Sequence, residues 1–209
     1  FNGGNINDPQ QLLQGKVAGL NIARVGSDPN QPFNIRLRGL STFGANAEPL
    51  VIIDGVIGGT LDSVDPADIE SINVLKDASA GAIFGSRGSS GVIIVTTKTG
   101  KGVAKSGLEY RGYVSSEEIS NLIPMASYDE FLSYGGLNLG SKTDWVDLVS
   151  RTAISQVHNI ALTGSSANGL SYRASLNYRD IEGVLNTSGF EQINGRINVT
   201  QKLLEDRLK

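Results

Sequence analysis

The chain has 209 residues, including 26 glycines, one histidine and no cysteine, and its formal net charge is −3. These numbers exclude disulfides, thiolate metal sites, cysteine nucleophiles and any site that needs two histidines, and they leave no basic field to hold nucleic acid. No apolar run approaches the roughly 18–20 residues of a membrane helix, and the N-terminus has neither the basic nor the apolar region of a signal peptide. Because the chain also lacks a starting methionine, we expect a processed product or a piece of a longer protein.

Short helices and short strands alternate over the first hundred residues. Aspartate followed by proline predicts helix starts at Asp8 and Asp65, and Asp77 predicts a third helix over 78–84. The pattern as a whole indicates a small α+β domain with a central mixed sheet. Its strands are expected where aliphatic residues alternate with polar ones or form a continuous run. These segments are 33–37, 50–53, 72–74 and 92–95.

The second half follows a strict two-residue period. Over 170–179, leucine, tyrosine and alanine occupy one face, and serine, arginine and asparagine occupy the other. Shorter stretches alternate in the same way at 108–114, 159–163 and 193–200. Two interpretations stay open, an ordinary antiparallel sheet with one wet face and the wall of an outer-membrane barrel. Since the smallest such barrels need about eight strands, most of a barrel would lie outside this chain.

The connection over 116–157 is too long for a hairpin loop. Within it, the sequence predicts a helix at 128–134 and a second short helix that Thr143 would cap and that carries Trp145. We expect these helical pieces to pack on another part of the protein.

No enzyme chemistry emerges from the candidate residues. The glycine-rich stretch 85–91 fits no phosphate-loop spacing and is interpreted as a helix-to-strand turn, and the lone His158 is interpreted as structural. A catalytic or calcium-binding role is weighed for the clustered carboxylates, but two of them are expected to cap helices and one lies where a strand turns. We therefore predict no catalytic residue, no metal and no cofactor. The clustered carboxylates are Asp54, Asp62, Asp65, Asp68, Glu70 and Asp77.

Three arginines remain as binding candidates. Arg36 and Arg38 share the polar face of one predicted strand, and Arg87 lies in the glycine-rich turn. Arginine on a rigid sheet suits bidentate pairing with carboxylates, whereas the alternative is a solvated strand face.

Five stretches of the first half form a recognisable series, and in chain order they are 12–20, 35–39, 49–55, 68–77 and 82–98. Together they resemble the plug domain of TonB-dependent outer-membrane transporters. The sequence Val-Leu-Lys-Asp-Ala-Ser-Ala that starts at Val74 resembles the SusC/RagA branch, typical of Bacteroidetes. Thr143-Asp-Trp145 and His158-Asn159 resemble the early barrel region of that branch. The resemblance implies a plug domain over 1–102 and, over 103–209, about three or four barrel strands with a helical insertion near 116–157.

The resemblance implies a function in nutrient import. Such proteins carry oligosaccharides, or peptides in the RagA type, across the outer membrane in an integral barrel of roughly 22 strands that the plug closes. TonB supplies the energy, a SusD-like lipoprotein acts as the lid, and membrane lipid surrounds the barrel. The alternatives are a soluble glycan-binding or signalling module with a plug-like sheet, and a secreted hydrolase that would depend on Asp54 or Glu70. The first alternative would pack the apolar face of 170–178 onto a second sheet instead of lipid.

Residue roles follow from the same resemblance. Arg38 and Arg87 resemble plug arginines that pair with barrel glutamates, and with Arg36 they form a predicted latch whose partners would lie beyond residue 209. The loop 41–48 is expected to face substrate, with Thr42, Phe43 and Asn46 as the contact residues.

Two features depart from the family pattern. Nothing before Asp8 resembles a TonB box or the first plug strand. We therefore expect this piece alone to be inactive in transport and to self-associate through open strand edges.

Overall fold

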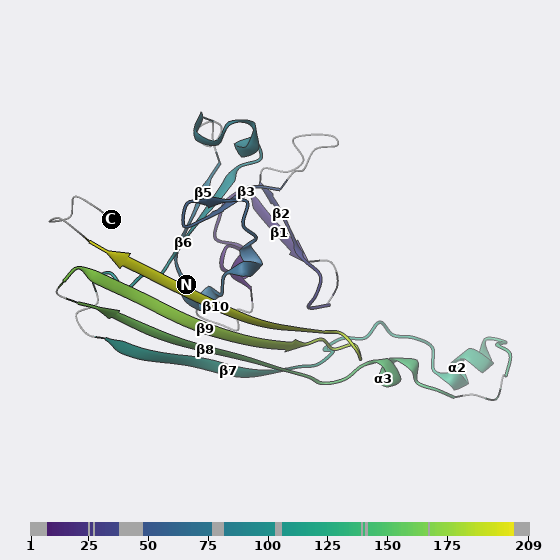
Figure 1. The fold of residues 1–209 in the computed structure, drawn as a ribbon. Helices are drawn as coiled ribbons and strands as arrows, with labels where there is room; N and C mark the ends of the chain where they lie inside the picture. The colour runs from purple at the N-terminus through teal and green to yellow at the C-terminus, as the bar shows by residue number, and fades with distance from the viewer. Residues whose placement is uncertain are drawn as a thin grey trace.

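The computed structural model describes residues 8–24, 26, 28–37, 48–76, 82–102, 106–138, 140, 142–166 and 168–202. In these residues the strands form three sheets, with the orders β1-β2, β4-β3-β6-β5 and β10-β9-β8-β7 (Figure 1). We call residues 8–102 the N-terminal part and β7–β10 the long sheet. None of the described helices is long and apolar enough to cross a membrane.

The central sheet of the N-terminal part is built on a parallel pair, β3 (Leu50–Ile53) and β6 (Val92–Thr97), with Leu50 opposite Val92. The antiparallel strands β4 (Val56–Ile57) and β5 (Ile69–Leu75) flank this pair. Val92, Ile93 and Val95 are fully buried, because the parallel pair is covered on both faces. The predicted mixed sheet is thereby confirmed.

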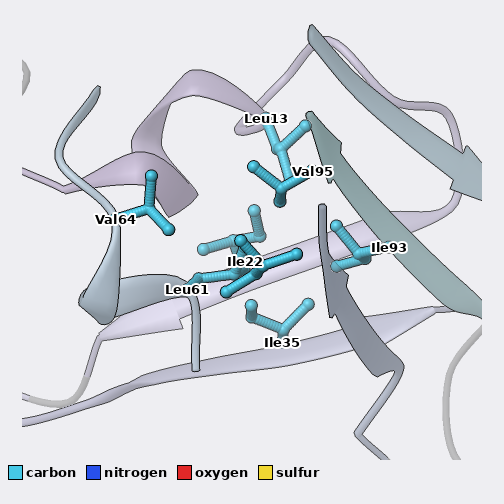
Figure 2. Packing of buried hydrophobic residues seen from close by; sticks show 8 residues of the cluster. Leu13, Ile22, Ile35, Leu61, Val64, Ile93 and Val95 are labelled. Atoms are coloured by element: carbon cyan, nitrogen blue, oxygen red, sulfur yellow. The ribbon is translucent and has the colours of Figure 1, made fainter. Parts of the chain in front are cut away.

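The predicted strand at 33–37 exists as β2 (Phe33–Leu37), but it pairs with β1 (Leu20–Arg24) in a separate two-stranded sheet. This hairpin closes the main core, where side chains from the first helical turn, the hairpin and the central sheet point toward one another (Figure 2). A smaller cluster around Ile52 and Val92 covers the other face of the central sheet. The main core consists of Leu13, Ile22, Ile35, Ile53, Leu61, Val64, Ile93 and Val95.

Four single 3-10 turns lie in the described residues of the N-terminal part: η1 (Pro9–Leu12), η2 (Leu61–Ser63), η3 (Pro66–Asp68) and η4 (Gly85–Gly88). Asp8 caps η1 by accepting from Gln10 N at 2.8 Å, and Asp65 caps η3 by accepting from Ala67 N at 2.8 Å, as the sequence predicts. Of the third predicted helix, residues 82–84 are helical, and Asp77 lies outside the described residues.

The long sheet is antiparallel throughout and consists of β7 (Gly107–Glu117), β8 (Ala153–Ser165), β9 (Leu170–Glu182) and β10 (Gly189–Gln201). The N-terminal part lies against one of its faces (Figure 1). That covered face is the polar one: Arg173, Asn177 and Arg179 are buried, while Leu176 on the opposite face is 54% exposed. An ordinary one-sided sheet buries its apolar face, so this inverted arrangement is that of a barrel wall that faces lipid. The outward apolar band includes Leu108, Tyr110, Val114, Ile154, Ile160, Leu162, Leu176, Ile193, Ile197 and Val199.

A tyrosine and a histidine make a polar contact on the face of the outward band. The Tyr110 hydroxyl lies 2.7 Å from His158 Nδ1, and the His158 ring stacks between Tyr110 and Tyr178. Gly112 makes room for this contact, because a Cβ there would lie 2.6 Å from the Tyr110 hydroxyl. His158 thus has a structural role, and no metal-binding cluster occurs among the described residues.

The connection from β7 to β8 spans 118–152 and holds α2 (Tyr128–Ser133) and α3 (Trp145–Val149), both beyond one end of the long sheet (Figure 1). Both helices agree with the predicted positions, but the predicted Thr143 cap is wrong. Asp144 caps α3 instead, because its carboxylate accepts from the backbone N–H groups of both Val146 and Asp147. Neither helix has a buried residue, and in α3 the backbone oxygens of Leu148 and Val149 accept from Asn186 in the turn between β9 and β10.

Candidate functional site: the interface between the N-terminal part and the long sheet

Opposite charges meet where the N-terminal part lies on the long sheet. Arg173 and Arg179 on β9 and Arg196 on β10 all point to the covered face, because strand side chains alternate. We call these three residues the inward arginines. Each pairs with a carboxylate of the N-terminal part, and these facing aspartates are Asp68, Asp65 and Asp54 in the same order.

Asp68 is the best-connected member of this interface. Its side chain is 2% exposed and accepts from Arg173 Nη2 at 3.0 Å, Ser175 Oγ at 2.6 Å and Asn177 Nδ2 at 2.9 Å. The three donors occupy alternate positions of β9, so a single straight strand presents all of them to one carboxylate. The backbone oxygen of Asp68 accepts from Lys98 N at 2.8 Å, which ties η3 to the end of β6.

Asp65 lies at the start of η3, three residues before Asp68, and faces Arg179, with 3.9 Å between Asp65 Oδ2 and Arg179 Nε. Burial raises the pKa of Asp65, while the backbone N–H of Ala67 and the charge of Arg179 oppose that rise. Arg179 also donates to the Gln192 side chain and, at 3.4 Å, to the backbone oxygen of Asp62. It therefore links η2 and η3 to both β9 and β10.

Asp54 anchors the opposite end of the interface. It occupies the left-handed region with φ of 50° in the turn between β3 and β4. Its carboxylate accepts from Thr97 N at 2.8 Å and Thr97 Oγ1 at 2.7 Å, and lies 3.3 Å from Arg196 Nη1. Asn198 adds two bonds of 3.1 Å, to Thr97 Oγ1 and to the Lys98 backbone oxygen. Strand β6 is thus fixed to β10 where the central sheet ends.

Two further carboxyl groups, which are not among the facing aspartates, lie near Arg179. Asp8 and Asp62 line a cavity of about 150 Å³, and Gln10 Nε2 donates to Asp62 Oδ1 at 2.9 Å. Burial raises the pKa of Asp8 to about 6; Asp62 adds to that rise, whereas the Gln10 backbone N–H and the charge of Arg179 oppose it.

We predict that the first turn of the N-terminal part is more stable at pH 5 than at pH 7.5. Folded Asp8 holds its proton up to about pH 6, but the unfolded carboxyl loses it near its ordinary pKa of 3.8. The folded state thus binds more protons between these values, and stability falls as pH rises through that range. Hydrogen exchange of residues 9–13, corrected for its intrinsic pH dependence, measures the effect. Asp8→Asn keeps a capping side chain and should flatten the dependence, whereas equal protection at both pH values in the wild type contradicts this assignment.

At Gly100 the N-terminal part approaches the backbone of the long sheet closely. A Cβ at Gly100 would lie 2.6 Å from Tyr172 N and 2.8 Å from Gly164 O, and closer still to Tyr172 O, all of them backbone atoms. We therefore expect Gly100→Ala to destabilise the interface by about 1–3 kcal/mol, the usual range for an overpacked site. Gly107→Ala is the control, because nothing lies within 4 Å of a Cβ there. Thermal unfolding of the two variants checks this, and equal melting temperatures contradict it.

The residues predicted for binding lie apart from these contacts. Arg36 and Arg87 are exposed and take no part in the bonds described above, and Arg87 lines an open cavity of about 760 Å³ with Glu48 and Asp62. Arg38, Thr42, Phe43 and Asn46 lie outside the described residues. The arginine latch and the substrate loop stay predictions. The sequence predicts a turn residue at Asp54 and a helix cap at Asp65, and it assigns no role to Asp68. The arginines on the polar face of 170–179 are the sequence signal that carboxylate partners should exist.

Comparison with known proteins agrees with this geometry. The family model described as the TonB-dependent receptor plug domain matches residues 2–92. The chain is 38% identical to the TonB-dependent receptor SusC of Bacteroides thetaiotaomicron, over 99% of this chain and 22% of that protein. It is 36% identical to the TonB-dependent receptor P26 of Formosa agariphila, over 95% of this chain and 22% of that protein.

Solved structures give the same answer. The RagAB peptide importer in its closed-closed state matches with a TM-score of 0.85 and 26% identity, over 97% of this chain and 28% of that chain. Its open-open state matches with a TM-score of 0.84 and 27% identity, over 98% of this chain and 28% of that chain. The chain spans about a fifth of the length of the curated relatives it matches. It belongs to the SusC/RagA-type TonB-dependent receptors, a family of outer-membrane β-barrel proteins, and the N-terminal part carries the plug of that family.

Proposed function

We propose that this chain is the plug and first wall strands of a TonB-dependent importer that takes up oligosaccharides, or alternatively peptides, together with a SusD-like lipoprotein. One observation carries the proposal: the polar face of the long sheet is buried beneath the plug while its apolar face is exposed. That arrangement suits a wall between lipid and a gated lumen. The names of SusC and of the RagAB peptide importer support the two cargo classes. We place the boundary between plug and wall at residues 102 and 103.

The chemistry of the interface suits a plug that moves. An apolar interface resists being wetted, whereas separated charges and amides recover hydrogen bonds to water. Buried ion pairs add little net stability, because desolvation offsets their attraction. The contacts of the facing aspartates can therefore fix the closed position without making its opening prohibitively costly.

The hydrogen-bond partners of the facing aspartates fit an importer better than an enzyme. The facing aspartates accept from arginine, hydroxyl, amide or backbone donors, and the Asp65 oxygen that has no hydrogen bond is buried opposite Arg179. The hydrolase alternative depends on Asp54 or Glu70. Thr97 and Arg196 engage Asp54, whereas Glu70 is exposed.

Deletion of the gene for the full-length protein tests the proposal. The deletion strain should fail to grow on oligosaccharides, or on peptides, that the parent uses, and should grow normally on the constituent monosaccharide or amino acids. A plasmid copy should restore growth only when TonB is present. Unchanged growth on every cargo contradicts the proposal. Recovery of the protein in the soluble fraction favours the soluble glycan-binding or signalling module.

We also retain the proposal of self-association for the isolated piece. Among the described strands, β7 and β10 are the outermost of the long sheet, and such edges offer unpaired backbone groups. Light scattering without detergent tests this, and a monodisperse monomer at high concentration contradicts it.

A further inference from the structure

We propose that the wall face beneath the plug selects cargo that carries carboxylates, because the inward arginines exchange the facing aspartates for carboxylates of the cargo when the plug moves aside. This inference rests on the proposed function, since it requires cargo to pass along this face. It adds a specificity role to three residues and names the chemistry of the cargo.

Charge is distributed unevenly across the interface. The inward positions of β9 and β10 hold three arginines and no carboxylate, because the acidic residues of these strands occupy the alternate positions. The carboxylates that pair with the inward arginines belong to the plug. On β7, by contrast, Glu109 and Arg111 pair with each other at 2.7 Å and add no net charge. Removal of the plug therefore leaves this part of the wall cationic.

The charges of the wall also act on a lysine of the plug. Lys98 lies at the end of β6, beside the long sheet, and its pKa is lowered chiefly by burial and then by the charges of Arg111 and Arg173. Asp68 and Glu109 oppose that shift and do not cancel it. The wall thus repels a cation at this position even while Asp68 is in place, and more strongly once the plug aspartate has left.

An anionic cargo lowers the cost of moving the plug. Arg173 and Arg179 are buried and paired in the closed state, and an arginine that loses its carboxylate must be rehydrated or paired anew. The planar guanidinium can donate hydrogen bonds to any carboxylate, whether it belongs to an aspartate, a uronic acid or an acidic peptide. Neutral cargo offers no such replacement. Cargo carboxylates should therefore speed passage in proportion to the inward arginines they meet.

The test compares uptake by cells that carry the full-length protein with uptake by the deletion strain. The probes are two matched pairs: a galacturonate trimer with its methyl ester, and a glutamate-containing peptide with its glutamine counterpart. We expect protein-dependent uptake of the acidic member to exceed that of its neutral counterpart by about five- to tenfold in the transported pair, the effect of one or two charge contacts. Which pair is transported distinguishes sugar from peptide as the source of the carboxylate.

Paired neutral variants connect the preference to the inward arginines. Asp68→Asn with Arg173→Gln, and Asp54→Asn with Arg196→Gln, remove both charges of a contact, so no buried charge is left alone. The second pair is partly exposed and is the safer substitution for folding. Each should lower the ratio of acidic to neutral uptake, whatever it does to the absolute rates. The control, Glu109→Gln with Arg111→Gln, should leave the ratio unchanged.

The outcomes separate the two proposals. Equal or faster uptake of the neutral member overturns the inference and leaves the import function standing. A ratio that survives both paired variants also overturns it, because the preference then originates elsewhere. If none of the four probes shows protein-dependent uptake, the import function itself is contradicted for these cargo classes, and the inference falls with it.

Discussion

Replacing Asp68 by alanine in the full-length protein is expected to weaken the closed position of the plug by about 3–5 kcal/mol, the usual cost of leaving a buried charge without its partner. Arg173 would keep its charge in a site where its side chain is 7% exposed, and the Ser175 hydroxyl and the Asn177 amide would lose their acceptor. Cells that carry the variant should admit large antibiotics that the outer membrane normally excludes, and protease should cleave the plug faster in purified protein.

The matched control for Asp68 is the double variant Asp68→Asn with Arg173→Gln. It removes both charges and keeps neutral hydrogen-bonding groups, so it should be closer to the wild type than Asp68→Ala is. A double-mutant cycle over these positions measures the coupling directly. Antibiotic exclusion and protease resistance equal to the wild type in Asp68→Ala would show that the closed plug does not depend on this cluster.

Ile197→Arg is expected to block assembly into the outer membrane. Ile197 is 76% exposed in the outward apolar band, and arginine on the lipid face of a barrel costs about 2–4 kcal/mol near the middle of the bilayer. In a water-soluble protein the same substitution would be harmless. The amount of folded barrel in outer-membrane fractions, read from its altered mobility before and after heating, measures the loss.

Leu148→Arg is the control for that substitution. Leu148 is 59% exposed, but it lies in α3, beyond the end of the long sheet (Figure 1). Assembly of this variant should match the wild type. Normal assembly of Ile197→Arg would contradict the lipid-facing assignment and would favour the soluble module.

The sequence predicts local structure well wherever the pattern of apolar residues is regular along a whole strand. The continuous aliphatic runs of β3 and β6 and the alternation of β9 are strong signals, because each reflects burial along a whole strand. The cap of α3 was placed one residue too early, since Thr143 and Asp144 are both good capping residues and only geometry chooses between them. Strand partners, such as the separate β1–β2 hairpin, depend on contacts between distant segments that no local pattern specifies.

The candidate site was harder to predict for a physical reason. A carboxylate such as Asp65 can cap a helix with one oxygen and face an arginine with the other, and only the capping role shows in the local sequence. Asp68 offered no local signal at all, because its donors lie more than a hundred residues away on β9. The family resemblance directed attention to plug arginines, whereas in the described residues the plug supplies the carboxylates and the wall supplies the arginines.

The wide sequence separation within the Asp68 cluster has a consequence for biogenesis. Asp68 and Arg173 lie 105 positions apart, so a chain delivered from its N-terminus presents the acceptor long before its donors. A carboxylate that will be fully buried has to stay hydrated until β9 arrives. The contacts of Asp68 can therefore form only after β9 has been delivered. Since the main core of the plug lies within residues 13–95, we expect that core to form earlier than the interface.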